Sequence, residues 1–584
     1  MRSREWFDIP GDPSTTALHI ERYTNFGISS EELRSGKPII GIAQTGSDLV
    51  PCNRIHMNLA LRVREGIREA GGIALEFPVH PIQETGKRPT AALDRNLQYL
   101  GLVEVLFGYP IDGVVLTIGC DKTTPALLMA ASTVDIPSIC LSSGPMMNGY
   151  WKGERAGSGT IVWKARKLLA TGEIDEEEFI KIVVDATTSP GFCNTMGTAT
   201  TMNSLAEGLG MSLPGCAAIP APLSERIEMS YRTGLRIVEM VKKDLTPSKI
   251  LTRKAFENSI VLNSAIGGST NAPIHINAIA RHVGVELEIE DWEKVGLEIP
   301  MLVNLQPGGK YLGEDFHRAG GVPAVMNALL KAGKLHDSAI TVNGKTVAEN
   351  YAETTTQDTD VIRTFQNPML ENAGFIVLKG NIFDSAVMKT SVISDSFRSQ
   401  YLDKPGSKNV FEVRAIVFEG PEDYRKRIND PQLNINVDCI LVIRGCGPVG
   451  YPGSAEVVNM QPPDKLIREG ILELPTLGDG RQSGTSGSPS ILNASPESAV
   501  GGGLALLKTG DMLRIDLNQG SLDVMLDKSE LQKRHDELKT EEIENQTPWQ
   551  EIYRNTVGQL SSGGIIELAA KYRKIRNTIP RHSH

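Results

Sequence analysis

The chain has 584 residues, of which 40% are hydrophobic and 22% are charged, and its formal net charge is −10. This length is too great for one ordinary hydrophobic core, so two or more domains are expected. The acidic balance argues against nucleic acid as a partner. The sequence has no apolar run of the roughly 20 residues needed to cross a bilayer, and its N-terminus lacks the apolar region of a secretory signal. We therefore expect a cytoplasmic protein with no membrane partner.

The first part of the chain alternates strand and helix patterns. Strands are predicted over residues 37–43, 74–78, 112–118 and 137–141, and helices over 58–70, 96–107 and from 125 to 132. This alternation predicts a mostly parallel sheet covered by helices on both faces. Ligands bind to such sheets beyond the carboxyl ends of the strands.

A polar stretch over residues 349–372 separates this part from a β-rich one. Short strands are predicted over residues 374–378, 410–418, 437–444, 512–517 and 522–526. Few long helices lie between them, and this pattern predicts a closed or partly closed β-barrel or a sandwich. The expected fold class is α/β, with an N-terminal α/β/α domain over residues 1–370 and a C-terminal barrel-like domain over residues 371–584.

Three cysteines stand in loops that we expect at one rim of the sheet. Cys52 and Cys120 come just after predicted strands, and Cys193 precedes a helix predicted over residues 200–208. Three thiolates can hold an iron–sulfur cluster and leave one iron without a protein ligand, and such an iron is a Lewis acid. The spacing alone does not establish a cluster, because it contains no C-x-x-C pair.

The remaining cysteines are expected to be packing residues. They are Cys140, Cys216, Cys439 and Cys446, which lie in or near predicted strands. Seven cysteines spread thinly over so long a chain do not indicate a disulfide framework.

Carboxylates stand beside these cysteines or in comparable loops. Asp121 follows Cys120 directly, Glu84 lies in a loop after the second strand, and Glu456 lies in a glycine-rich loop of the β-rich part. Carboxylate oxygens suit Mg²⁺ as thiolates suit iron, so two adjacent residues could serve two neighbouring metals. Taken alone, Glu84 and Glu456 are better explained as solvated loop acids and Asp121 as a helix cap.

The densest polar loop of the chain runs over residues 477–485. Ser483 lies there near Arg481, and a nearby cation can lower the pKa of a serine that acts as a base or nucleophile. The loop is not the G-x-S-x-G elbow, because Arg481 stands where the first glycine should be. Taken alone, it is also consistent with a plain surface turn.

Read together, six segments resemble the dihydroxy-acid/6-phosphogluconate dehydratase family, and specifically its sugar-acid (pentonate) branch. They lie at residues 51–53, 119–125, 193–199, 267–271, 453–456 and 480–484 and span nearly the whole chain. Six co-linear motifs are far more specific than any one of them. The branched-chain members read the serine loop as Gly-Arg-Phe-Ser-Gly-Gly, whereas Gln482 and Thr485 stand here, and this difference favours a polyhydroxylated substrate.

The resemblance implies a hydro-lyase that removes water from a small-molecule sugar acid, with D-xylonate favoured, to give the 2-keto-3-deoxy acid. Its cofactors would be an iron–sulfur cluster, [2Fe–2S] in the pentonate branch with [4Fe–4S] as the alternative, and Mg²⁺. By motif match, the cluster ligands would be Cys52, Cys120 and Cys193, and the residues around Mg²⁺ would be Glu84, Asp121, Lys122 and Glu456. The family carboxylates the lysine, which would turn Lys122 into an oxygen donor. Ser483 would be the base, and Thr485 would orient the substrate or the serine.

Two alternatives remain open at this stage. The same chemistry could act on L-arabinonate, D-gluconate or a branched 2,3-dihydroxy acid. The chain could instead be a non-catalytic iron–sulfur sensor, which would need neither the carboxylates nor the serine. The resemblance also suggests a homodimer or homotetramer.

Overall fold

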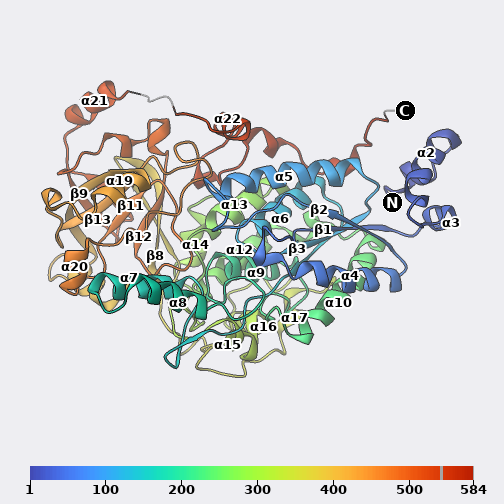
Figure 1. Ribbon diagram of the computed structural model, residues 1–584, viewed down its shortest axis with the longest axis horizontal. Helices are drawn as coiled ribbons and strands as arrows, with labels where there is room; N and C mark the ends of the chain where they lie inside the picture. Colours follow the sequence, from blue (N-terminus) through green and yellow to red (C-terminus); the bar gives the residue numbers. More distant parts are fainter. Residues whose placement is uncertain (540–542, 583–584) are drawn as a thin grey trace.

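The chain folds into an α/β part and a closed β-barrel that lie side by side (Figure 1). The computed structural model describes residues 1–539 and 543–582. The α/β part is built on β1 (Ile39–Gln44), β2 (Ile73–Pro78), β3 (Gly113–Ile118) and β4 (Ser138–Ser142). These strands pair in the order β2-β1-β3-β4, and every pairing is parallel. The predicted strands and their parallel arrangement are confirmed.

Helices cover this sheet above and below (Figure 1). The main ones are α4 (His56–Glu69), α5 (Ala91–Gly108), α6 (Thr123–Val134), α9 (Thr198–Gly208), α10 (Ser224–Lys242), α12 (Arg253–Ala265) and α13 (Ala272–Val283). Strands β1, β3 and β4 are buried along their whole length, as expected for a sheet sandwiched between helices. Helix α5 begins five residues before its predicted start, because the hydroxyl of Thr90 caps it by accepting a hydrogen bond from the Leu93 amide at 3.2 Å.

The β-rich part is a closed eight-stranded barrel, so of the two architectures predicted for it the barrel is confirmed. Its strands are β7 (Phe375–Gly380), β8 (Phe383–Lys389), β9 (Val410–Glu419), β10 (Cys439–Arg444), β11 (Thr476–Gly478), β12 (Ser490–Ser495), β13 (Met512–Asp516) and β14 (Ser521–Val524). Strands β8, β11 and β12 were not among the predicted strands. Strand β11 has only three residues, and β12 carries Asn and Ser at buried positions, so neither shows an apolar alternation.

The barrel contains a run of parallel strands. Strands β9, β10, β11 and β12 pair in parallel with one another in that order, whereas β9 pairs antiparallel with β13, and β8 pairs antiparallel with both β7 and β12. The loops after β10 and β11 therefore leave the barrel at the same end, and these loops carry Glu456 and Ser483.

The segment after the barrel returns to the α/β part and runs along it toward the N-terminus (Figure 1). The indole Nε1 of Trp549 donates to the Leu93 carbonyl at 3.3 Å. The guanidinium of Arg95 donates to the carbonyls of Gly563 and Gly564 at 2.7 and 2.6 Å. The residues after β14 thus contribute to the packing of α5, and the domain boundary at residue 370 stays a prediction.

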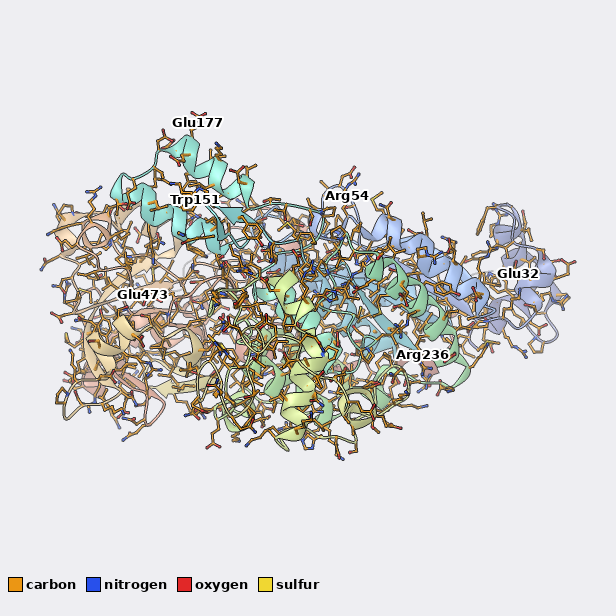
Figure 2. The ribbon with its side chains drawn as sticks, turned by 90° about the horizontal axis from the view of Figure 1, so that it is seen from below. Glu32, Arg54, Trp151, Glu177, Arg236 and Glu473 are labelled. Carbon is orange, nitrogen blue, oxygen red and sulfur yellow. The ribbon has the colours of Figure 1, made fainter. Side chains whose placement is uncertain are left out.

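A small helical unit stands beside the barrel. It consists of α7 (Thr160–Thr171) and α8 (Glu176–Asp185), which share a hydrophobic cluster of their own. Figure 2 shows Glu177, in α8, projecting from the molecule on the same side as Trp151, while Glu32 lies at the far end from the barrel residue Glu473. Among the helices in the described ranges, none combines the length and apolar character needed to cross a membrane.

Candidate active site

Two of the predicted cysteines lie in neighbouring loops at the carboxyl end of the sheet. Cys52 sits in a 3₁₀ turn, η1 (Pro51–Asn53), after β1, and Cys120 lies between β3 and α6. The side chain of Asn53 joins the two loops, because its Oδ1 accepts from the Cys120 amide at 2.7 Å and its Nδ2 donates to Thr45 Oγ1 at 2.9 Å. The two thiols interact, and this interaction lowers the pKa of the Cys52 thiol and, together with burial, raises the pKa of the Cys120 thiol.

The third cysteine reaches the same rim through a β-bridge that forms just beyond the end of β4. Phe192 forms a β-bridge with Pro145, and its amide donates to the Gly144 carbonyl at 3.0 Å. The next residue, Cys193, is thereby placed near Cys52, whose charge helps to raise the pKa of the Cys193 thiol. Burial raises the pKa of the Cys193 thiol to about 12, so a positive centre is needed to hold it as a thiolate. Three soft donors at one rim, with Cys120 buried and Cys52 and Cys193 partly exposed, fit an iron–sulfur cluster.

Three carboxylates converge next to these thiols. Oxygens of Glu84, Asp121 and Glu456 all lie within 4.8 Å of one another. They come from the loops after β2, β3 and β10, so the barrel supplies one of the three. Three hard oxygen donors at this separation fit a divalent cation such as Mg²⁺.

Two cations lie among these carboxylates. Lys122 is fully buried, and its Nζ is 2.9 Å from Glu84 Oε2, 3.8 Å from Glu456 Oε1 and 4.0 Å from Asp121 Oδ2. The shortest of these contacts lacks hydrogen-bond geometry, so it is an ion pair only. Arg481 Nη1 donates to Glu456 Oε1 at 2.7 Å, and Arg481 Nη2 is 3.7 Å from Glu84 Oε1.

The pKa values of the three carboxyls differ. Burial raises the pKa of Asp121 to about 7, and burial and the charge of Glu84 raise the pKa of Glu456. Burial also acts on Glu84, but Lys122 and Arg481 outweigh it and lower the pKa of that carboxyl. The two cations therefore favour the ionised form of Glu84, whereas burial disfavours the ionised forms of Asp121 and Glu456, which an added cation would stabilise.

The serine loop follows β11 and packs against two elements of the α/β part. Ser483 Oγ lies 2.9 Å from Thr485 Oγ1, which accepts a hydrogen bond from the indole Nε1 of Trp163 at 3.1 Å. Gly484 is required between them, because a Cβ there would lie 2.5 Å from the Thr198 amide nitrogen. The loop is thus wedged between α7 and the N-terminus of α9.

Asn271, the last residue of the predicted 267–271 motif, joins the two barrel loops. Its Nδ2 donates to Glu456 Oε1 and to the Gln482 carbonyl, each at 3.1 Å. Its Oδ1 accepts from Arg481 Nη1 at 3.1 Å. One side chain of the α/β part therefore fixes the positions of Glu456, Arg481 and the backbone beside Ser483.

Two cavities border this region. One of about 590 Å³ is lined by Trp163, Thr485, Gln306, Arg155 and Lys310, among others. The other, of about 180 Å³, is lined by residues that include Glu84, Glu456, Arg481, Lys87 and Arg425. The serine loop lies between the larger cavity on one side and the carboxylates on the other.

All the residues that the sequence nominated for the site lie in this one region, and their chemical roles stay predictions. Four partners were not predicted to act there: Asn53, Gln83, Trp163 and the side chain of Asn271. Asn53 and Gln83 stand directly beside the nominated Cys52 and Glu84, so their positions alone gave a signal. Nothing in the sequence connects Trp163 with Thr485. The four cysteines expected to be packing residues are free and buried.

Comparison with known proteins extends over the whole chain. Residues 37–350 match the model of the dihydroxy-acid/6-phosphogluconate dehydratase N-terminal domain, and residues 360–564 match that of the C-terminal domain. The chain is 61% identical to a D-xylonate dehydratase of Caulobacter vibrioides over 100% of this chain and 98% of the relative. It is 45% identical to an L-arabinonate dehydratase of Rhizobium leguminosarum over 91% and 90%. It is 37% identical to a dihydroxy-acid dehydratase of Caldanaerobacter subterraneus over 92% and 95%.

Fold, site and comparisons define a dehydratase, that is, a hydro-lyase. The chain belongs to the dihydroxy-acid/6-phosphogluconate dehydratase family, and the resemblance drawn from six sequence motifs is confirmed. Members of this family typically carry an iron–sulfur cluster and Mg²⁺, and the thiols and carboxylates of this chain fit both groups.

Proposed function

We propose that this protein dehydrates D-xylonate to the 2-keto-3-deoxy acid. The observation that carries the proposal is 61% identity over the full length of both chains to a D-xylonate dehydratase, against 45% to an L-arabinonate dehydratase. The polar residues Gln482 and Thr485 in the serine loop, and the Arg155, Gln306 and Lys310 side chains that line the adjacent cavity, also suit a polyhydroxylated acid.

The cofactor assignment follows from donor chemistry. Cys52, Cys120 and Cys193 would hold the cluster, which we assign as [2Fe–2S], and Glu84, Asp121 and Glu456 would hold Mg²⁺. When bound, these groups supply Lewis acidity that favours loss of the C2 proton and departure of the C3 hydroxyl.

Lys122 would serve the metal as a carboxylated lysine. As an ammonium it is a poor neighbour for Mg²⁺, because it is fully buried 2.9 Å from Glu84 and pairs with the oxygens that the metal needs. Carboxylation would replace this positive charge with a negatively charged oxygen donor at the same place. Arg481 would then remain as the cation that balances the buried carboxylates.

Ser483 would act as the base that removes the C2 proton. As an alkoxide, Ser483 Oγ would take the C2 proton, the C2–H electron pair would form the C2=C3 bond, and the C3–O bond would break. The departing hydroxide would take the proton back from the Ser483 hydroxyl and leave as water, and the enol would tautomerise to the keto acid. The indole N–H can only donate, so Thr485 accepts from Trp163 and its own hydroxyl proton is free for Ser483 at 2.9 Å. This directed chain stabilises negative charge on Ser483 Oγ.

The same chemistry on L-arabinonate, D-gluconate or a branched dihydroxy acid is the second candidate. The cytoplasmic location and the homodimeric or homotetrameric assembly expected from the sequence remain predictions. The non-catalytic sensor is disfavoured, because it would leave Glu84, Asp121, Glu456 and Ser483 without a purpose in one buried place.

The test is keto-acid formation by the anaerobically purified, cluster-loaded protein with Mg²⁺. D-xylonate, L-arabinonate, D-gluconate and 2,3-dihydroxyisovalerate are compared by kcat/KM. The proposal expects D-xylonate to have the highest value. A higher value for another acid would correct the substrate, and no turnover of any of them with an intact cluster would favour the sensor.

A further inference from the structure

Gln83 lies between the two kinds of metal ligand. It directly precedes Glu84 in the loop after β2, and its side chain points toward the cysteine loop after β1. Its Nε2 lies 3.2 Å from Cys52 Sγ, within the range of an N–H···S hydrogen bond. Neither the family resemblance nor the proposed mechanism gives this residue a role.

The backbone of Gln83 is held firmly enough to aim the side chain. Its carbonyl accepts from the amides of Gly86 and Lys87 at 3.2 and 3.0 Å, which closes a turn immediately after it. The preceding residue Ile82 is buried. The start of the same loop is tied to α5, because Gln98 Nε2 donates to the His80 carbonyl at 2.6 Å.

The amide orientation suits a thiolate rather than a neutral thiol. A thiolate sulfur only accepts, so the amide must present its N–H, and a carbonyl oxygen in its place would be repelled. The other end of the amide, Gln83 Oε1, is buried and makes no hydrogen bond to the described residues. The amide does not titrate in the physiological range, so this donor is present at every working pH.

The three sulfurs differ in their protein donors. Cys52 and Cys120 share a thiol–thiol contact, which deprotonation of both would remove. Cys52 has in addition the Gln83 amide, which lies 3.2 Å from its sulfur. A hydrogen bond to a cluster sulfur withdraws electron density from it and stabilises the reduced state.

We propose that Gln83 is a positioning residue that donates an N–H···S hydrogen bond to the Cys52 thiolate and thereby raises the reduction potential of the cluster. The same bond makes the cluster more electron-poor, which favours Lewis-acid chemistry at an open iron. Because Glu84 is the next residue, one loop sets both the electron density at a sulfur and the place of a metal carboxylate. The inference rests on Cys52 being a cluster ligand, as proposed above.

The test compares the cluster in the wild-type protein, Gln83→Met and Gln98→Met. Gln83→Met keeps the length of the side chain and removes the donor, whereas Gln98→Met loosens the same loop without touching a sulfur. Iron and sulfide content, the visible charge-transfer bands and the midpoint potential in an anaerobic redox titration are measured on each full-length, loaded protein. Gln83→Met is expected to lower the midpoint potential and shift the bands, and Gln98→Met to leave both as in the wild type.

A wild-type potential and spectrum in Gln83→Met at full cluster content would overturn the inference, as would an equal shift in Gln98→Met. If Gln83→Met does not assemble a cluster, Gln83→Glu takes its place, since it keeps the shape and replaces the N–H by an acceptor; it must also lower the potential. A wild-type protein that binds no cluster would refute the cofactor assignment itself, and this result is distinct from an intact cluster that ignores Gln83.

Discussion

The α/β part and the barrel place their site residues by the same device. In the sheet, Cys52 and Asp121 follow the parallel strands β1 and β3, and in the barrel, Glu456 and Ser483 follow β10 and β11, which are also parallel to each other. The carboxyl ends of parallel strands gather their loops at one edge in both folds. The direction of strand pairing, more than the fold class, decides where this site lies.

The two parts differ in what they supply and in how their loops are held. The sheet supplies the thiols and two carboxylates, and its loops are tied within the same part by side chains such as Asn53. The barrel supplies Glu456, Arg481 and the serine. Its two loops pair with each other through the bridge between Glu456 and Arg481, and Asn271 holds both from the α/β part. The thiols are thus held by contacts within the α/β part, whereas the carboxylate cluster and the base depend on contact between the two parts.

The largest effect is expected when a cysteine that the α/β part supplies to the cluster is removed. Cys193→Ser should lose the iron–sulfur cluster and with it all turnover, because only two thiolates would remain. Iron and sulfide analysis and visible absorption measure the loss. Cys140→Ala is the matched control, since Cys140 is buried within β4 and should leave the cluster in place. Full cluster content in Cys193→Ser would count against ligation by the three cysteines.

The second-largest effect is expected when Ser483, the proposed general base supplied by the barrel, is removed. Ser483→Ala should lower kcat by about 10²–10⁴-fold, the usual contribution of a general base, while iron and sulfide content stay as in the wild type. Single-turnover assays with D-xylonate measure the change. Turnover near that of the wild type, with the cluster intact, would refute the assignment of Ser483.

Breaking the ionic contact between the two parts should destabilise the protein. Arg481 lies between Glu84 of the sheet and Glu456 of the barrel, so Arg481→Met leaves both carboxylates without this partner. A broken buried pair typically costs about 3–5 kcal/mol. Thermal unfolding of the metal-free protein measures the loss, and the double variant Arg481→Met/Glu456→Gln should recover part of it. Unchanged unfolding midpoints would show that the contact contributes little.

A second contact between the α/β part and the barrel predicts that the stability of the folded protein depends on pH. Lys389, at the end of β8, is buried and donates to the Gly267 carbonyl at 2.7 Å, and burial lowers its pKa to about 7. Between about pH 7 and the ordinary lysine pKa of about 10.4, the unfolded chain binds this proton and the folded chain does not. Stability should therefore rise with pH there by up to about 1.4 kcal/mol per unit.

The comparison of Lys389→Met with Lys379→Met isolates this group, since Lys379 is an exposed lysine of neighbouring strand β7. Lys389→Met should lack the gain in unfolding midpoint between pH 7 and 9 that the wild type and Lys379→Met show. The same gain in all three proteins would assign it to other groups.

The smallest expected effect concerns the link between α7 and the serine loop. Trp163→Phe removes the indole N–H that donates to Thr485 but keeps an aromatic ring. One hydrogen bond contributes about 1 kcal/mol, so kcat should fall about five-fold with little change in KM. A larger change in KM than in kcat would indicate that Trp163 contacts the substrate instead of orienting the loop.

Much of the fold could be predicted from the sequence because its signals are local. The buried runs of β1, β3 and β4 and the helices between them show the βαβ alternation directly. Strands β11 and β12 could not be predicted, because one is very short and the other is polar although buried, and only their neighbours in the barrel make them strands.

The active site, like the fold, has features that could be predicted from the sequence and features that could not. Motifs and loop positions nominated residues that do come together, including Cys193, whose place depends on a bridge between Phe192 and Pro145 that spacing alone could not show. The contacts of Trp163 with Thr485 and of Asn271 with Glu456 join residues 322 and 185 positions apart. Such pairs arise only from the packing of α7 and α13 on the barrel loops, and no local pattern encodes them.

The most direct test of the account is an anaerobic structure of cluster-loaded Ser483→Ala with Mg²⁺ and D-xylonate. The account predicts one acid molecule between the loops of the sheet and the loops of the barrel, with its carboxylate near Glu84, Asp121 and Glu456. Its C2 carbon should lie close enough to residue 483 for proton transfer to the missing hydroxyl, about 3–3.5 Å from where that oxygen would be. An acid that contacts the loops of only one of the two parts, or one with C2 turned away from residue 483, would contradict the claim that sheet and barrel build a single dehydration site.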